Sequence, residues 1–195
     1  MMTMLYQILG LLVLAAFYGC YFAKMLAQKR QGIATDQMGR GKTGFVKWVE
    51  ITLKIATCLV PVAEVASILL GTTALPGALR VFGFILGVAG NAVFIASVVT
   101  MRDNWRAGVS PAEKTELVTQ GIYQWSRNPA FLGFDLVYAG LALMFFNWPL
   151  FIVSLFAAAM LHLQIVNVEE DFLLEAFGDD YLAYRRKVRR YLGRR

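Results

Sequence analysis

Five long apolar stretches leave this chain essentially one kind of fold. They run over residues 4–22, 48–70, 79–101, 131–146 and 150–166. A helix needs ~20 apolar residues to cross the hydrocarbon core of a bilayer, and fewer are enough where the crossing is short. Inside a membrane the backbone polar groups must be hydrogen-bonded within the protein, which a helix achieves by itself. The sequence therefore predicts an all-α, polytopic membrane protein with five transmembrane helices.

The composition agrees with this fold class. Of the 195 residues, 58% are hydrophobic and 16% are charged, whereas soluble domains have about 45–50% apolar and about 25% charged residues. A soluble protein of this size must cover its surface with polar groups. An ordinary soluble domain is excluded, and so are a disordered chain and, with two cysteines, a disulfide scaffold.

The links between the stretches predict the organisation of the chain. Asn147-Trp148-Pro149 joins the last two stretches and is short enough to force a helical hairpin. Phe177-Gly178-Asp179 is typical of a helix end followed by a new helix, so cytoplasmic helices are expected at the C-terminus. We predict a three-helix transmembrane part, 1–101, and a part with the hairpin and the cytoplasmic segments, 102–195, which form one integrated domain.

The basic residues orient the chain in the membrane. They cluster in the first loop, after the third stretch and beyond residue 184, whereas the opposite loops hold almost none. By the positive-inside rule the N-terminus is outside and the C-terminus is cytoplasmic. The first stretch is followed, not preceded, by basic residues, so a permanent anchor is expected and not a signal peptide. The net charge of +6 is thus an orientation signal, and the expected partner is the bilayer and not nucleic acid.

Two cytoplasmic segments flank the predicted hairpin, and each carries a feature that suits a charged ligand. Asn128-Pro129 predicts a helix start, because a residue before proline avoids the helical region and proline suits the first turn. Such a start binds carboxylates or phosphates, although it can also be a plain cap. The acids Glu169, Glu170 and Asp171 follow the last stretch, where the helix dipole disfavours them unless a cation is near. That cation is either Arg127 or the basic tail in a salt bridge, or a bound ligand.

Three polar residues lie inside the predicted spans. Glu64 and Asp135 are costly in hydrocarbon and are expected to face the protein interior or water. For Glu64 a structural hydrogen bond or pairing is favoured over a functional role, and for the single histidine, His162, a bond to a neighbouring helix is favoured over a role as a base. For Asp135 a structural and a functional role both remain open. No other His or Cys lies at ligand spacing from His162, so no protein-bound metal is expected.

Two ordered motifs carry a resemblance to a known family. The first is Leu117-Val118-Thr119-x-Gly121-x-Tyr123-x-x-x-Arg127-Asn128-Pro129-x-Phe131-x-Gly133, and the second is Glu169-Glu170-x-x-Leu173-x-x-x-Phe177-Gly178-x-x-Tyr181-x-x-Tyr184. Separated by a short membrane hairpin, they resemble the isoprenylcysteine carboxyl methyltransferase family. The resemblance covers roughly residues 113–191. Phospholipid methyltransferases and membrane sterol reductases have a related C-terminal arrangement.

The resemblance implies a reaction and a set of site residues. It implies S-adenosylmethionine as methyl donor, S-adenosylhomocysteine as product, and a lipid-linked cysteine carboxylate as acceptor. Glu169 and Glu170 would be the catalytic residues. The cofactor-binding residues would be Thr115, Glu116, Leu117, Val118, Tyr123, Arg127, Asn128, Pro129, Ala130, Phe131 and Glu169. A sulfonium cation suits aromatic faces and carboxylates.

Three positions depart from the family pattern. Asn128 replaces a histidine, Phe131 replaces a tyrosine, and Ile165 stands where the family has an arginine four residues before the glutamate. That arginine is expected to hold the substrate carboxylate. Gln164 is adjacent, but one residue is ~100° around a helix, so Gln164 is not an obvious substitute.

Three alternatives remain open at this point. A phospholipid amine N-methyltransferase would have the same donor, and the missing arginine favours it. An NADPH-dependent lipid reductase would need a 2′-phosphate site, for which Arg102, Arg106 and Arg127 are available. A non-catalytic membrane adaptor would leave the acids and both motifs as coincidence.

Overall fold

The computed structural model describes residues 2–71, 73–109 and 116–195, and in these ranges it contains helices and no β-strand. The α-helices are α1 (Met2–Arg30), α2 (Gly44–Leu70), α3 (Gly77–Met101), α4 (Pro129–Met144), α5 (Trp148–Gln164) and α6 (Glu170–Lys187). The short helical turns are η1 (Arg102–Asn104), η2 (Gly121–Gln124) and the π-helical η3 (Ile165–Glu169). The predicted all-α class is therefore confirmed.

Four helical runs are long and apolar enough to cross a membrane: Thr3–Arg30, Gly44–Leu70, Gly77–Asn104 and Trp148–Lys187. In the last run the apolar part is α5, because charged residues recur throughout α6. The protein is therefore a multi-pass membrane protein. The fourth predicted stretch corresponds to α4, which is apolar but has only 16 residues.

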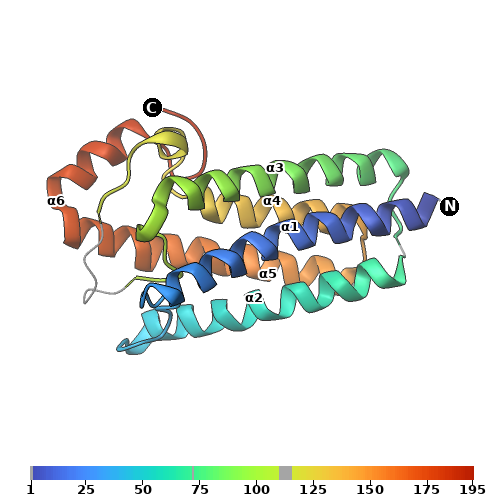
Figure 1. The fold of residues 1–195 in the computed structure, drawn as a ribbon, viewed down its shortest axis with the longest axis horizontal. Coiled ribbons are helices and arrows are strands. Elements are labelled where there is room, and N and C mark those ends of the chain that lie inside the picture. The colour runs from blue at the N-terminus through green and yellow to red at the C-terminus, as the bar shows by residue number, and fades with distance from the viewer. Residues whose placement is uncertain (1, 72, 110–115) are drawn as a thin grey trace.

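The helices α1 to α5 lie side by side along the long axis of the molecule (Figure 1). The N-terminus is at one end, and α6 and the C-terminal segment are at the other. Gly178 bends α6, because its backbone has φ 50° and ψ −120° inside the helix. The predicted helix break at this glycine is confirmed.

Glycines let α3 and α4 touch along their backbones. A Cβ atom on Gly83 would lie 2.6 Å from the carbonyl oxygen of Gly140, and one on Gly140 would lie 2.6 Å from the amide nitrogen of Gly87. Further along, a Cβ on Gly90 would lie 2.9 Å from the carbonyl oxygen of Gly133. Lipid tails give helices no hydrophobic reason to associate, so close packing through small residues replaces it. We call these five positions the glycine seam.

The first loop and the segment after α3 are hydrogen-bonded to each other. The Gln37 amide donates to the Ala107 carbonyl at 2.8 Å, and the Ala107 amide donates to the Thr35 carbonyl at 2.9 Å. The side-chain amide of Gln28 in α1 donates to the Trp105 carbonyl at 2.8 Å. The first loop and the segment after α3 therefore meet at the end of the bundle that carries α6.

The polar residues inside the predicted spans differ in burial, and not all are bonded as expected. Glu64 is fully buried, and neither of its carboxylate oxygens has a hydrogen-bond partner among the described residues. The prediction of a structural hydrogen bond was wrong for Glu64. For His162 a bond is present, from Nδ1 to the Tyr191 hydroxyl at 2.6 Å, and its partner lies in the C-terminal segment.

The glycine seam predicts a large effect of one added methyl group. Gly140→Ala should lower the free energy of unfolding by about 1–3 kcal/mol, because overpacked helices must move apart. The shift of the unfolding transition in detergent measures this. Gly19→Ala in α1 is the matched control, since a Cβ there meets nothing within 4 Å. Equal transitions for the two variants would contradict the role given to the seam.

Candidate active site

The π-helical turn η3 places Gln164 and Glu169 on one side of the α5–α6 run. Gln164 Nε2 donates to Glu169 Oε1 at 3.3 Å across five residues. In an α-helix, residues five apart point ~140° away from each other, whereas the i→i+5 pattern of a π-helix aligns them, and π-turns are frequent at functional sites. Gln164 is 1% exposed. The turn therefore brings the last residue of α5 to the first acid of the cluster.

The same amide reaches an acid in α2. Gln164 Nε2 is 3.3 Å from Glu50 Oε1, and Glu50 is fully buried. The Gly39 amide donates to Glu50 Oε2 at 2.6 Å, and Lys42 forms an ion pair with Oε1. Buried charges need this kind of pairing. The first loop thus holds Glu50, and Glu50 in turn faces the amide of Gln164.

Two hollows adjoin this group of residues. A largely apolar cavity of about 430 Å³ lies among α1, α2, α4 and α5, and its lining includes Leu53, Phe131, Phe134 and Gln164. A smaller pocket of about 80 Å³ is lined by residues that include Glu116, Glu169, Asn104 and Phe172. Both linings contain Arg106 and Gly108. An anionic pocket therefore lies next to a cavity that suits a lipid chain.

Glu169 lies beyond α5, outside the apolar part of the run, and its carboxyl has a pKa close to neutral pH. Burial raises the pKa of Glu169 to about 7, and the charge of Glu50 adds to this effect. The hydrogen bond from Gln164 and the charge of Lys42 act in the opposite direction. Glu169 therefore changes charge close to physiological pH.

Glu170 is fully engaged by two arginines. Arg190 donates from Nε to Oε1 at 2.8 Å and from Nη2 to Oε2 at 2.9 Å, while Arg127 Nη1 lies 2.9 Å from Oε1. Arg127 also donates to the Tyr181 hydroxyl at 2.7 Å. Burial by itself would raise the pKa of Glu170, but the Arg190 hydrogen bond and the two positive charges hold the pKa below its ordinary value. The acids were expected to pair either with Arg127 or the basic tail, or with a bound cationic ligand. At Glu170 the structure shows the first of these, with Arg127 and Arg190 as the partners.

Two further predicted residues hold the C-terminal segment against the bundle. The buried Tyr123 hydroxyl is 2.8 Å from Ser97 Oγ in α3, and the Tyr184 hydroxyl donates to the Tyr123 carbonyl at 2.6 Å. Burial raises the pKa of Tyr123 above its ordinary value. Asn128 Nδ2 donates to the Arg190 carbonyl at 3.1 Å. These polar groups have partners within the protein.

The predicted helix start at Pro129 is confirmed. Helix α4 begins at Pro129, and Asn128 before it is non-helical, with φ −133°. The Asn128 amide donates to Ser126 Oγ at 3.1 Å. Ala130 and Phe131, in the first turn, line the apolar cavity. The start of α4 is thus directed at the lipid-sized cavity.

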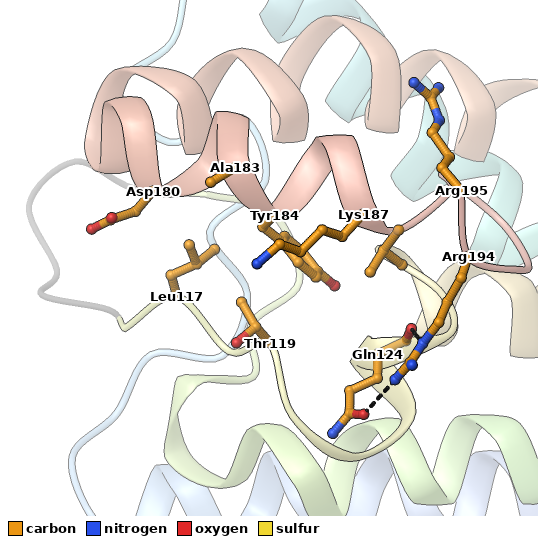
Figure 2. Close-up of a pocket in the computed structure, with 10 residues that line it drawn as sticks. Leu117, Thr119, Gln124, Asp180, Ala183, Tyr184, Lys187, Arg194 and Arg195 are labelled. Carbon is orange, nitrogen blue, oxygen red and sulfur yellow. Dashed lines mark hydrogen bonds between the residues drawn. The ribbon is translucent and has the colours of Figure 1, made fainter.

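A third hollow, of about 750 Å³, lies between the segment around Leu117 and α6 (Figure 2). Figure 2 shows Leu117 and Thr119 across from Lys187, with Arg194 hydrogen-bonded to Gln124 at 2.7 Å. Both Leu117 and Val118 pack on the cluster of Tyr123, Tyr181, Tyr184 and Val188, and Val118 is not in the lining of this hollow. Leu117 and Val118 are therefore not in the lining of the pocket that holds Glu116 and Glu169.

The structure divides the predicted cofactor-binding set. Glu116 and Glu169 line one pocket, and Ala130 and Phe131 line the adjoining cavity. The other described members are in neither of these two linings and make the contacts given above: Leu117, Val118, Tyr123, Arg127, Asn128 and Pro129. Thr115 lies outside the described residues. No three His, Cys, Asp or Glu side chains of the described ranges are grouped to hold a metal ion.

Three residues of this site were not predicted. Glu50 carried a usable signal, because an acid at the start of an apolar stretch is costly unless it is paired. Its partner Lys42 follows from the loop fold and not from spacing. Gln164 was not expected to substitute for the family arginine, and its hydrogen bond to Glu169 across the π-helical turn was not foreseen. Ile165, at the position of the family arginine, is fully buried.

Comparison with known families decides which family this arrangement belongs to. A family model described as phospholipid methyltransferase matches residues 79–180, more than half of the 195 residues. The chain belongs to the phospholipid methyltransferase family. The matched range begins in α3 and includes Glu116, Gln164 and Glu169.

The similar members of this family carry one name. Protein-S-isoprenylcysteine O-methyltransferase of Saccharomyces cerevisiae is 35% identical over 72 residues, which are 37% of this chain and 30% of the yeast enzyme. The enzyme of that name from Xenopus laevis is 30% identical over 113 residues, 56% of this chain and 39% of its own length. The Mus musculus enzyme is 28% identical over 109 residues, 54% of this chain and 38% of its own. The resemblance predicted from the motifs is confirmed, and the chain spans well under half the length of these relatives.

The double ion pair of Glu170 predicts a stability effect in this family member. Glu170→Gln should lower the free energy of unfolding by about 3 kcal/mol, because Arg127 is then left buried without its counter-charge. The difference from the wild type should shrink in acid, as the pH falls through the lowered pKa of Glu170 and the wild-type carboxylate is itself protonated. Unfolding transitions in detergent measure both effects. Glu175→Gln, at an exposed position of α6, is the control and should leave the transition in place.

Proposed function

We propose that this protein transfers a methyl group from S-adenosylmethionine to the carboxylate of an isoprenylcysteine-type acceptor at the membrane surface. The observation that carries the proposal is the anionic pocket of Glu116 and Glu169 beside the apolar cavity lined by Phe131 and Gln164. One suits a cationic donor and the other a lipid chain. Membership of the family supports methyl transfer over NADPH-dependent reduction, and the names of the relatives support this acceptor.

The residues around the small pocket fit the charge of the donor. Glu116 and Glu169 supply carboxylates and Phe172 supplies an aromatic ring, and both kinds of group attract a sulfonium. At about 80 Å³ the pocket has room for the charged centre of the donor and not for the whole molecule. We propose that these three residues hold that centre, with Ala130 and Phe131 at the edge of the adjoining cavity.

The donor supplies an electrophilic methyl carbon: a carboxylate oxygen of the acceptor bonds to it, the carbon–sulfur bond breaks with its electron pair left on sulfur, and a methyl ester and S-adenosylhomocysteine result. A carboxylate is ionised at pH 7 and needs no general base. The protein therefore acts by alignment and electrostatics. Because opposite charges neutralise each other in this reaction, the apolar lining by Leu53 and Phe134 favours it by keeping water out.

The two consecutive acids would have different roles. Glu169 faces the small pocket with the amide of Gln164 beside it, so we propose that it contacts the donor. Glu170 is held by Arg127 and Arg190, so we propose that it positions the C-terminal segment. This makes Glu170 a positioning residue, in place of the catalytic role first expected.

We also propose the topology that the basic residues predict. In it α4 crosses the membrane as the fifth span, paired with α5 in a hairpin, the N-terminus is outside, and the C-terminus is cytoplasmic. The contact of α4 with α3 through Gly83 and Gly140 supports a crossing α4. The bonds between Gln37 and Ala107 support one integrated domain formed by 1–101 and 102–195.

Amine N-methylation of a phospholipid is a second candidate. The family description names phospholipids, and no arginine occupies the position of buried Ile165. An ammonium acceptor must first lose a proton, and a carboxylate with a pKa of about 7, as burial gives Glu169, suits that task. A panel of prenylcysteine analogues and aminophospholipids with labelled methyl donor separates the two, because a methyl ester is labile to base and a methylamine is not.

Donor binding tests the proposal directly. The purified protein in detergent should bind S-adenosylhomocysteine in calorimetry and be stabilised by it against heat, with no such effect of NADPH. Glu169→Gln should reduce turnover by at least ~100-fold, because a preorganised charge at the reacting centre is lost. Glu175→Gln, on the exposed face of α6, should retain turnover. Folded protein without donor binding at millimolar concentration would overturn both methylation candidates.

The state of Glu169 predicts a pH dependence. Its carboxyl loses a proton as the pH rises through about 7, the value to which burial raises its pKa. Affinity for S-adenosylmethionine, measured by calorimetry, should therefore increase from about pH 6 to about pH 8, by at most roughly tenfold per unit for one proton. Glu169→Gln should remove this slope. A slope that persists in the variant would assign it to another group.

A further inference from the structure

We propose that Gln164 recognises the acceptor by accepting a hydrogen bond from an N–H group next to the carboxylate to be methylated. This inference rests on the proposed function and deepens it, because it specifies which lipid-linked acids are preferred. It concerns an atom that the bonds within the protein leave unused, the amide oxygen of Gln164.

Two carboxylates fix the orientation of the Gln164 amide. Its nitrogen lies 3.3 Å from Oε1 of Glu50 and 3.3 Å from Oε1 of Glu169. An amide nitrogen carries two hydrogens, and a carboxylate accepts but does not donate. Glu50 is ion-paired with Lys42 and accepts from the amide, so the nitrogen faces Glu50 and, beside it, Glu169. Because Gly39 and Lys42 hold Glu50 in turn, the amide is locked in this direction.

The amide oxygen is then left without a donor. It is buried and has no hydrogen-bond partner among the described residues, and the whole side chain is 1% exposed. A buried acceptor without a partner is costly, and each such case in a protein calls for an explanation. A ligand with an N–H group would satisfy this oxygen.

The side chain of Gln164 is part of the lining of the acceptor cavity. Of the three members of the amide cluster, Gln164 lines the apolar cavity, whereas Glu169 lines the small pocket and Glu50 is in neither lining. Since the nitrogen faces the acids, the oxygen is the atom turned away from them.

Two other polar side chains at this cavity already have partners. The Thr57 hydroxyl donates to the Leu53 and Lys54 carbonyls of its own helix, at 3.0 and 3.1 Å. The Lys54 ammonium is paired with the Asp36 carboxylate. Gln164 therefore offers an unused acceptor at the edge of the donor pocket.

An acceptor of the isoprenylcysteine type matches this arrangement. Its α-carbon carries both the reacting carboxylate and an N–H group, and its thioether carries a chain for the apolar cavity. With the N–H at Gln164 and the chain among Leu53, Phe131 and Phe134, the carboxylate is directed to the pocket of Glu169. The hydrogen bond thus also contributes to alignment.

Two analogues test this interaction without any methyl donor. N-acetyl-S-farnesylcysteine has the N–H group, and S-farnesyl-3-thiopropionate has the same chain and carboxylate without it. We expect the wild-type protein in detergent to bind the first about fivefold more tightly, the usual net effect of one hydrogen bond. Calorimetry or the shift of the unfolding transition gives the ratio of the two dissociation constants.

Variants assign the preference to one side chain. Gln164→Leu should bring the ratio of the two dissociation constants close to one. Once the methyl donor is added, the kcat/KM values of this variant for the two analogues should likewise become nearly equal. Thr57→Val is the matched control, because it removes a polar group from the same cavity and should keep the ratio.

The outcomes distinguish a failure of the role given to Gln164 from a failure of the proposed function. Equal binding of both analogues by the wild type would overturn the role of Gln164 and leave the proposed function intact, and this result does not depend on whether a variant folds. A preference that survives in folded Gln164→Leu would overturn it as well. If neither analogue binds to folded wild-type protein, the proposed acceptor class itself fails.

Discussion

The contact between the backbones of α3 and α4 is the constraint on which the rest of the molecule depends. At Gly83 and Gly140 the two helices leave no space for a methyl group. This contact fixes the position of α4 along the axis of α3. It therefore also fixes where the first residue of α4 lies relative to α3. Helix α4 begins at Pro129, shortly after Tyr123 in the chain, and the Tyr123 hydroxyl is hydrogen-bonded to Ser97 of α3. Packing deep in the bundle thereby positions residues at the end that carries α6.

At that end, two neighbouring acids have opposite surroundings. Glu170 has two arginines, which keep it ionised and tie the C-terminal segment to the bundle. At Glu169, burial and the charge of Glu50 outweigh the hydrogen bond from Gln164 and the charge of Lys42, so its pKa rises to about 7. Environments that drive two carboxyl pKa values apart are a common way to divide structural and chemical roles. The proposed division of labour between Glu169 and Glu170 follows from this difference.

Much of the fold follows from local sequence. The apolar stretches coincide with α1 to α5 to within a few residues, except that α1 continues to Arg30. The helix start at Pro129 and the break at Gly178 were predicted from the stereochemistry of proline and glycine. The site was predicted less completely. The motifs indicated Glu116 and Glu169 together, but they also grouped with them Tyr123 and Arg127, whose polar groups are bonded to other residues.

The sequence by itself determined the membrane fold, the family and the presence of an unusual acid cluster, because hydrophobic length, charge and motifs are properties of short segments. Only the tertiary structure decided that Gln164 joins Glu169 to Glu50 of α2. That contact needs a π-helical turn, which shifts the side chains out of α-helical register, and the packing of α5 against α2. Local preferences encode neither of these, since both arise from contacts between residues far apart in the chain.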